Sequence, residues 1–303
     1  MTPSERARDL LRGAFDTHVH ISPDVVERII DDISLAHRFA ELGMAGFGLK
    51  SHYGSTAERA SVVRAAVPGI QVLGAISLNR GVGGMNPLAV EIAAREGARI
   101  VWFPTVDSEN ESHERDAPPG AKVPVWVKLQ LDLREQGIEI EPVPVVDGNG
   151  GVLPETQTVL ELIARHDMVL ATGHLSRDEI FTVVDAAVAA GVKTIVVTHP
   201  EFPSQSVGAD DQRALAEKGA LLERCFTTPH TGKVEWETWI ENIRATGAEN
   251  SVLSTDLGQS FNPPVEDGLA LMVDRLLDAG FDEEEVHTMA VKNTRRVAGA
   301  EPL

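Results

Sequence analysis

The sequence predicts an α/β fold, a (β/α)8 TIM barrel with a loop and hairpin inserted after the fourth strand. Short apolar segments alternate with helix-like segments along almost the whole chain, as they do in a parallel sheet. There are eight such apolar segments, and eight parallel strands close a barrel. The chain has 303 residues, a length that such barrels reach as one unit, so we predict a single domain over residues 1–303.

The predicted strands occupy residues 14–20, 45–51, 70–77, 99–104, 168–173, 193–198, 220–225 and 251–255. Most of them are continuous apolar runs, as expected for strands that are buried on both faces. Helical patterns follow most of the strands, at residues 33–42, 56–67, 87–96, 154–164, 177–190 and 264–279.

Residues 105–150 interrupt this alternation and form the predicted insertion. They are acidic and polar at first, and a Pro-Pro-Gly sequence follows at 118–120. An Asp-Gly-Asn-Gly-Gly sequence at 147–151 predicts a hairpin turn within residues 143–152. A long loop above the C-terminal face of a barrel is typical of a lid or substrate wall, and the alternative is a disordered insertion.

The composition excludes several classes of partner. With 43% hydrophobic residues the chain can bury a large core, while a net charge of −19 argues against nucleic acid and anionic membrane surfaces. The single cysteine, Cys225, cannot form an internal disulfide, which fits a reducing compartment. We see no secretory signal and no apolar stretch of roughly 20 residues, so we predict a cytoplasmic protein that acts on a small molecule.

Four of the predicted strands end in potential metal ligands. His18 and His20 end the first strand, and because they are two residues apart their side chains leave the same face. The fifth, sixth and eighth predicted strands end in His174, His199 and Asp256, respectively. Chemistry in a barrel of this type resides at the carboxyl ends of the strands. Five polar side chains in a barrel mouth without partners would cost several kcal/mol each, so the pattern predicts a divalent-metal site.

These residues, in this strand order, resemble the amidohydrolase superfamily of metal-dependent (β/α)8 enzymes. The resemblance implies that His18 and His20 bind a metal and that Asp256 is both a ligand and a proton acceptor. It also implies that His174 and His199 complete a second metal site or contact substrate. Residues 289–294 are similar to the helix that closes this fold. The expected cofactor is one or two divalent ions, zinc first, with Mn, Fe, Ni or Co as alternatives, and a homo-oligomer is expected by analogy.

The sequence departs from the superfamily pattern at one position. Binuclear members supply a bridging carboxylated lysine or a glutamate at the end of strand 4, and residues 101–105 contain neither. Lys50 instead ends strand 2. An amine among metal ions has a lowered pKa, and a neutral amine can react with carbon dioxide to give a bridging carbamate. The alternatives are a mononuclear centre in which Lys50 binds a substrate carboxylate, and a surface lysine.

Several further residues are candidates for binding substrate. His52 and Tyr53 follow strand 2, and Arg80 follows strand 3 beside three glycines that would equally suit an ordinary loop. Arg224 ends strand 7, and His230 lies on the loop that follows it. We predict that these five side chains line the pocket.

The predicted function is a metal-dependent hydrolase that acts on an amide, a cyclic amide or a lactone. A bound divalent ion lowers the pKa of water to about 7, and Asp256 would accept the proton as the water attacks. A second metal, or His199, would polarise the substrate oxygen, and Asp256 would return the proton to the leaving group. A lyase that decarboxylates or hydrates a small carboxylated substrate is the alternative, and a non-catalytic binding protein is the third possibility.

Overall fold

The computed structural model describes residues 2–111 and 124–301, and all eight predicted strands are present in it. They form one sheet in which each strand pairs in parallel with the next one along the chain. The strands are β1 (Phe15–Val19), β2 (Gly46–Leu49), β3 (Gln71–Ser77), β4 (Ala98–Trp102), β5 (Val169–Ala171), β6 (Thr194–Val197), β7 (Leu221–Cys225) and β8 (Ser251–Ser254).

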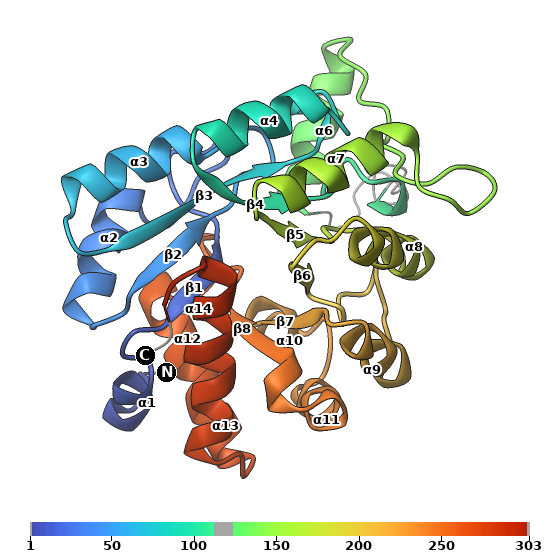
Figure 1. Cartoon of the computed structure of the whole chain (residues 1–303). Coiled ribbons are helices and arrows are strands. Elements are labelled where there is room, and N and C mark those ends of the chain that lie inside the picture. Colours follow the sequence, from blue (N-terminus) through green and yellow to red (C-terminus); the bar gives the residue numbers. More distant parts are fainter. Residues whose placement is uncertain (1, 112–123, 302–303) are drawn as a thin grey trace.

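The first and last strands meet and close the sheet into a barrel. Val19 forms a parallel bridge with Leu257, just beyond β8. The amide of Asp256 donates to the carbonyl of His18 at 2.8 Å, and the amide of His20 donates to the carbonyl of Leu257 at 2.7 Å. The predicted (β/α)8 barrel is therefore confirmed, with helices surrounding the strands (Figure 1).

The helices follow the strands in the expected alternation, and all six predicted helices are present. They are α2 (Asp32–Glu41), α3 (Ala57–Ala66), α4 (Pro87–Arg95), α7 (Pro154–Arg165), α8 (Arg177–Ala189) and α12 (Val265–Asp278). The structure adds α1 (Glu5–Leu10), α6 (Val125–Glu135), α9 (Ala209–Glu217), α10 (Thr227–His230), α11 (Trp236–Thr246), α13 (Glu283–His287) and α14 (Asn293–Ala298). Within the described ranges, none of the helices has the length and apolarity needed to cross a lipid bilayer.

The core has an inner part inside the barrel and an outer part between strands and helices. Alternate strand residues such as Phe15, Ile100 and Trp102 fill the interior. Val297 and Ala298 of α14 pack against them, and α14 contacts both β1 and β8. This helix covers the amino-terminal end of the barrel, so the polar strand ends lie at the opposite, carboxyl end.

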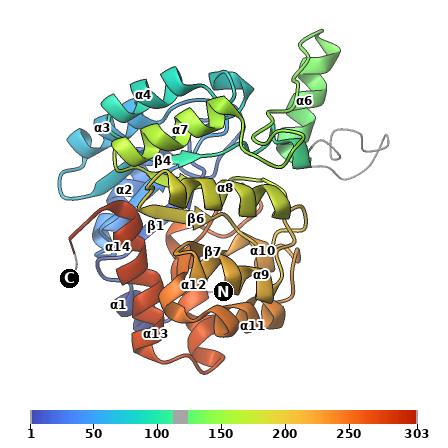
Figure 2. The same ribbon diagram turned by 45° about the vertical axis from the view of Figure 1, so that its right-hand side comes forward.

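The region that interrupts the alternation contains structure that the sequence did not predict. A 3₁₀ turn, η2 (Glu109–Glu111), and helix α6 lie between β4 and α7, and α6 projects away from the barrel (Figure 2). The predicted hairpin turn is present, since Val146 and Val152 form an antiparallel bridge. The Pro-Pro-Gly sequence at 118–120 lies outside the described residues.

Candidate metal centre

His18, His20 and Asp256 converge at the carboxyl end of the barrel. One ligand atom from each of the three lies within 4.8 Å of the other two. The Nε2 atoms of His18 and His20 are 3.2 Å and 3.1 Å from the same oxygen, Asp256 Oδ1. The strand register shifts between Asp16 and Val19, which turns the end of β1 inward and brings both imidazoles to this point.

The ring of His18 is fixed from behind by a glutamate of β7. Glu223 Oε1 lies 3.0 Å from His18 Nδ1 and accepts a hydrogen bond from Ser254 Oγ at 2.9 Å. Glu223 is buried, yet the facing His18 holds its pKa at about 2, so it is a carboxylate that accepts the Nδ1 proton. Burial and Lys50 lower the pKa of His18, but Glu223 and Asp256 together raise it above its usual value. With Nδ1–H held by Glu223, Nε2 is the nitrogen that a metal would bind in place of its proton, and it is directed at the convergence point.

Lys50 reaches the same point from the neighbouring strand. Its side chain is buried, with Nζ 3.0 Å from His18 Nε2 and 5.1 Å from the centre of the Trp102 ring. The inward residues that precede it on β2 are glycines, Gly46 and Gly48, and a Cβ at Gly48 would lie 2.3 Å from the carbonyl oxygen of Thr17. This close approach of β1 and β2 leaves Lys50 beside the histidines.

Three further histidines surround this group. The ring of His52 lies 4.8 Å from that of His20, and the ring of His199 lies 5.0 Å from that of His174 and 6.2 Å from that of His18. Thr105 and Gln205 orient two of them, through contacts of 2.8 Å with His52 Nδ1 and 3.1 Å with His199 Nδ1.

His174 and His199 are next to the ligand group but do not belong to it. In the described part of the chain, their nitrogen atoms are not among those that share the 4.8 Å spacing. His174 Nδ1 instead lies 3.0 Å from Glu111 Oε1. This arrangement suits side chains that face a substrate better than additional ligands to the same ion.

Burial sets the protonation states that a metal site requires. Burial lowers the pKa of His20, His174 and His199, the last to about 3, so these imidazoles are neutral at pH 7 and keep a lone pair. Burial alone would raise the pKa of Asp256, but His18 and His20 hold it well below its usual value. Burial also lowers the pKa of Lys50, against the opposing charges of Asp256 and Glu223.

Two of these residues have a strained backbone. Asp256 has φ 54° and His199 has φ 26°, both in the left-handed region that non-glycine residues rarely adopt. Each such residue costs about 1–3 kcal/mol, and the surrounding structure must compensate for it. Strain at the ends of β6 and β8, on two residues that face the same point, indicates a functional site.

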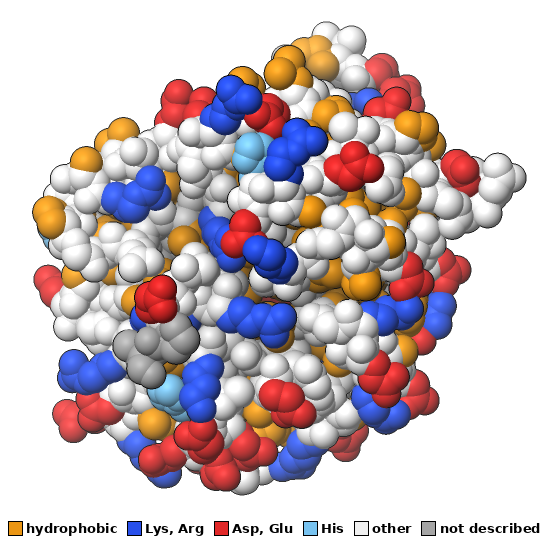
Figure 3. All heavy atoms as spheres, in the orientation of Figure 1, with side chains coloured by type: hydrophobic (Ala, Val, Ile, Leu, Met, Phe, Trp, Pro, Cys, Tyr) orange, Lys and Arg blue, Asp and Glu red, His pale blue; other side chains and the backbone are white. Residues whose placement is uncertain are grey.

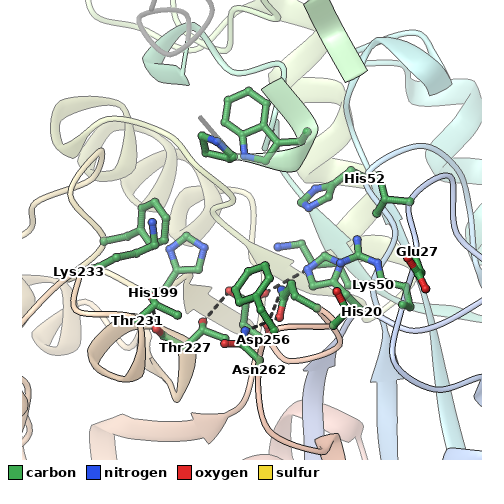
Figure 4. A pocket seen from close by; sticks show the side chains of 18 of the residues that line it. His20, Glu27, Lys50, His52, His199, Thr227, Thr231, Lys233, Asp256 and Asn262 are labelled. Carbon is green, nitrogen blue, oxygen red and sulfur yellow. Dashed lines mark hydrogen bonds and ion pairs between the residues drawn. The ribbon is translucent and has the colours of Figure 1, made fainter. Parts of the chain in front are cut away.

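A cavity of about 440 Å³ opens above these residues, a volume typical of small-molecule sites. Figure 4 shows Asp256 near its centre, with His20, Lys50 and His52 to one side and His199 and Lys233 to the other. Its floor and walls include the predicted residues His20, Lys50, His52, Tyr53, His174, His199 and Asp256. The predicted residues that the structure brings together around the cavity therefore come from the carboxyl ends of β1, β2, β5, β6 and β8.

The prediction that Arg224 faces substrate is wrong. Side chains alternate along β7, so Leu221, Glu223 and Cys225 point into the barrel and Arg224 points out toward the helices. There its guanidinium is fully buried and pairs with Glu201, and it also donates to Gln212 Oε1 at 2.6 Å. Arg224 therefore packs β7 against the helices, and the inward polar residue of this strand is Glu223.

Arg80 and His230 are also not among the residues that line this cavity. The guanidinium of Arg80 donates to the carbonyls of Glu141 and Pro142 at 2.8 Å and 2.5 Å, so it fastens the region after β4 to the barrel. His230 ends α10, stacks on Phe226 with ring centres 4.6 Å apart, and lines a second cavity with Trp236. A short loop or helix turn reverses direction, and sequence spacing alone does not reveal which side its residues face.

Sequence reasoning missed four polar residues of this site. Glu223 and Glu111 support His18 and His174, Thr227 Oγ1 donates to Asp256 Oδ2 at 2.9 Å, and Lys233 lines the cavity. Both faces of β7 are buried, so the sequence does not mark Glu223 as an inward residue. The other three lie in single turns or loops, which are too short to show a periodicity.

The donor set fits a divalent ion. Two imidazoles and a carboxylate are ligands that Zn, Fe, Ni, Co and Mn accept, and the carboxylate behind His18 is the usual support of a metal-bound histidine. His20 Nδ1 is buried and has no hydrogen-bond partner among the described residues, so His20 lacks the support that Glu223 gives to His18. Lys50 fits only as a neutral or modified amine, because an ammonium at 3.0 Å from His18 Nε2 would repel the ion.

One family model matches the chain, that of DUF6282, described as a family of unknown function, over residues 13–223. The chain belongs to this family. The DUF6282 match spans the barrel from β1 to β7 and includes His18, His20, Lys50 and Glu223, whereas Asp256 lies beyond it. No curated protein matches this DUF6282 chain in sequence.

Solved structures share the fold over nearly the whole chain. An amidohydrolase from Pseudomonas aeruginosa is 11% identical, with a TM-score of 0.62 over 99% of this chain and 100% of its own. A putative 2-pyrone-4,6-dicarboxylic acid hydrolase from Pseudomonas putida is 16% identical, with a TM-score of 0.58 over 96% and 99%. A 2,6-dihydroxybenzoate decarboxylase from Rhizobium is 12% identical, with a TM-score of 0.53 over 94% and 97%. The resemblance to the amidohydrolase superfamily is thus confirmed at the level of the fold.

Proposed function

We propose that this protein is a metal-dependent hydrolase that cleaves an amide, cyclic amide or lactone bond of a small molecule. The observation that carries the proposal is the convergence of His18, His20 and Asp256 within 4.8 Å, with His20 and Asp256 lining the cavity and His18 buried behind them. Hydrolases are also among the proteins that share the fold, including the amidohydrolase and the pyrone dicarboxylic acid hydrolase. A divalent ion at this point, zinc first, would supply activation of water and polarisation of a substrate oxygen.

Asp256 is the residue that moves the proton in this proposal. Its Oδ1 faces both metal-binding imidazoles, and its Oδ2 accepts from Thr227, which fixes the plane of the carboxylate. Its lowered pKa keeps it ionised at neutral pH, so it can accept a proton from the attacking water. The protonated Asp256 carboxyl group then donates that proton to the leaving amine or alcohol.

His199 faces the substrate as a hydrogen-bond acceptor in the same proposal. Gln205 Oε1 accepts from its Nδ1 at 3.1 Å, which leaves the lone pair of this neutral imidazole on Nε2, where it can accept from a substrate N–H or O–H or bind a second metal. The aromatic ring of Phe202, 4.9 Å away, packs against it and excludes water from one side. His199 therefore presents a fixed imidazole toward the centre of the cavity.

A substitution of Asp256 separates its catalytic role from its role as a ligand. We expect Asp256→Asn to lower turnover by about 10²–10⁴-fold, the usual contribution of a general acid–base group, while much of the metal stays bound. Turnover would be followed on a panel of lactones and cyclic amides, and bound metal by elemental analysis. Near-normal turnover of the variant would contradict the role of Asp256.

Metal binding itself is tested with two histidine variants. We expect the purified protein to bind one or two equivalents of divalent metal, His20→Ala to lose that affinity, and His230→Ala to retain it. His230 is the matched control because it lines the second cavity. The proposal is contradicted if the wild-type protein binds no zinc, manganese or cobalt and its activity does not increase when they are added.

Lyase chemistry on a carboxylated substrate is the second candidate, and Lys50 is the observation that favours it. The Lys50 amine lines the cavity beside His18, where an unmodified amine could hold a carboxylate. Two bound metals and a carbamate at Lys50 favour hydrolysis, whereas one metal and a free amine favour the lyase. Metal counting together with NMR of protein exchanged into isotopically labelled bicarbonate distinguishes the two.

A further inference from the structure

The charged side chains that line the cavity are distributed unevenly. Acidic residues outnumber basic ones in the whole chain, 46 to 27, yet three of the five charged lining residues are basic. They are Arg28, Lys50 and Lys233, against Glu27 and Asp256. Lys50 and Asp256 belong to the candidate metal centre, so the charges that remain to select a substrate are those of Glu27, Arg28 and Lys233.

Arg28 is already neutralised by a neighbour. Its guanidinium contacts Asp24 Oδ2 through both Nε and Nη2 at 2.7 Å, and the two side chains are almost completely buried. A second carboxylate at this position would have to displace Asp24. Glu27 is exposed beside this pair, and its negative charge further disfavours an anion on this side of the cavity.

Lys233 lies on the opposite side of the cavity from Glu27 (Figure 4). Its Nζ is 4.2 Å from the centre of the Phe202 ring, and Phe202 in turn packs against His199. Lys233 forms no ion pair with any carboxylate of the described residues. Glu111, which its charge stabilises, is instead in direct contact with His174 and Ser204. Lys233 is therefore held over an aromatic ring next to the reaction centre, with its charge available to a ligand.

The loop that carries Lys233 is tied to the metal centre. The amide of Lys233 donates to the carbonyl of Thr228 at 3.0 Å, and the neighbouring Thr227 donates to Asp256. The backbone of this loop thus has a defined position relative to Asp256, and the exposed side chain of Lys233 extends from it over the ring of Phe202. A substrate group that binds Lys233 would fix the orientation of the scissile bond over Asp256.

We propose that the substrate carries a carboxylate that binds Lys233, on the β6–β7 side of the cavity and away from the metal ligands. The other lining residues are uncharged side chains, both apolar, such as Val26 and Phe261, and polar, such as Thr231 and Asn262, and they suit an uncharged body. The substrate class is then a small amide, cyclic amide or lactone that bears one carboxylate beside the bond to be cleaved. This inference rests on the proposed function, because the metal centre defines where that bond lies.

Three matched hydroxamates test the inference by binding rather than by turnover. The hydroxamate group is a metal ligand, and the tails of succinic monohydroxamate, butanohydroxamate and 3-aminopropanohydroxamate end in a carboxylate, a methyl and an ammonium group. With zinc-loaded protein we expect the carboxylate tail to bind about three- to tenfold more tightly than the methyl tail, and the ammonium tail more weakly, by calorimetry at low salt.

Variants then assign that preference to Lys233. Lys233→Met keeps an unbranched apolar chain over Phe202 and should abolish the preference, whereas Lys233→Arg should retain it. Glu27→Gln is the matched control on the opposite rim, and it should leave the preference intact or slightly larger. A preference that survives in Lys233→Met, or that is absent in the wild type, would overturn the inference without contradicting the proposed metal centre. If none of the three hydroxamates binds, the proposed function itself fails.

Discussion

Glu223 determines which nitrogen of His18 can bind a metal. Its carboxylate accepts the Nδ1 proton of His18 at 3.0 Å, and its other oxygen accepts from the backbone amide of His199 at 3.3 Å. One buried side chain therefore positions two residues of the site, from β1 and β6. Since Glu223 does not face the cavity, it acts through these residues rather than on the substrate.

We expect Glu223→Gln to weaken zinc binding by about 10–100-fold, the usual effect of losing the carboxylate behind a metal-bound histidine. The amide is nearly the same size, so the change removes charge rather than volume. Zinc affinity would be measured by competition with a chromophoric chelator, with the exposed Glu237→Gln on α11 as control. Equal zinc affinity in the two variants would show that Glu223 is only a packing residue.

At this scale the sequence predicted the residues that end strands and missed those that support them. His18, His20 and Asp256 could be found because each follows an apolar run, and the ends of parallel strands meet at one edge. Glu223 and Arg224 are adjacent within β7, and since both faces of the strand are buried, hydrophobicity does not distinguish inward from outward. Only the three-dimensional register decides that Glu223 is the inward one.

The strands were easier to predict from local sequence than several of the helices. Each strand was predicted because its apolar run is bounded by polar or turn residues, and the ends agree to within two residues. Helix α6 was missed because its apolar residues recur at every second position, as in a strand, rather than every three to four residues. Helices α9 and α11 have clear acidic first turns, at Asp210 and Glu237. Helix α9 has few apolar residues, whereas α11 has an apolar face comparable to that of α2 and was not among the predicted helices.

The start of α2 offers a test at the scale of an element. Asp31 is its N-cap, and the carboxylate accepts from the amide of Ser34 at 2.8 Å and from its hydroxyl at 2.7 Å. This helix follows the loop that carries Glu27 and Arg28, so its start anchors one wall of the cavity. We expect Asp31→Ala to lower the free energy of unfolding by about 1 kcal/mol at pH 7.

The same cap should depend on pH in a defined direction. The hydrogen bonds from Ser34 lower the pKa of Asp31 below its usual 3.8, so the folded state holds the proton less tightly than the unfolded state. The stabilisation is therefore present above the unfolded pKa and is lost as the pH falls through the lowered folded value. Urea unfolding from pH 7 down to the acid limit should show the Asp31→Ala deficit shrink below about pH 4.

Asp31→Asn is the control for this pH dependence. Asparagine caps a helix about as well as aspartate but does not titrate, so this variant should resemble the wild type at pH 7. A deficit of Asp31→Ala that stays constant down to the acid limit would mean that the ionised carboxylate contributes nothing beyond its hydrogen-bonding geometry.

The whole molecule distributes its excess negative charge over the surface rather than around the site. Acidic and basic side chains are interspersed over the face shown in Figure 3. Many charged side chains of the described residues form surface ion pairs, such as Arg177 with Asp211, which contribute little to stability. The net charge of −19 therefore arises mainly at the surface, whereas three of the five charged residues that line the cavity are basic.

Closure of the barrel is the feature of the whole molecule on which the site depends. Asp256 and His20 come from opposite ends of the chain, and they meet only because the segment after β8 pairs with β1. The number of strands predicted that a barrel closes, but the contacts at the junction join residues more than 230 positions apart. Local sequence patterns contain no information about such contacts, which is why their detail could not be predicted.

Gly258 is the residue that this junction tolerates least to change. Its φ is +134°, and a Cβ there would lie 1.4 Å from the carbonyl oxygen of His20. The Gly258 carbonyl also accepts from the amide of Ile29 at 2.9 Å, which joins the cavity wall to the junction. We expect Gly258→Ala to lower the free energy of unfolding by about 3 kcal/mol or more, since backbone strain and overpacking each cost about 1–3 kcal/mol.

Because the His20 carbonyl must move to admit the new methyl group, zinc affinity should fall together with stability. Gly148→Ala is the matched control, since Gly148 lies in an exposed turn where an added methyl group would meet no neighbouring atom within 4 Å. Denaturant unfolding and zinc titration of both variants measure the two effects. If the Gly258→Ala variant unfolds like the control, or loses stability with unchanged zinc affinity, barrel closure and the metal centre are independent.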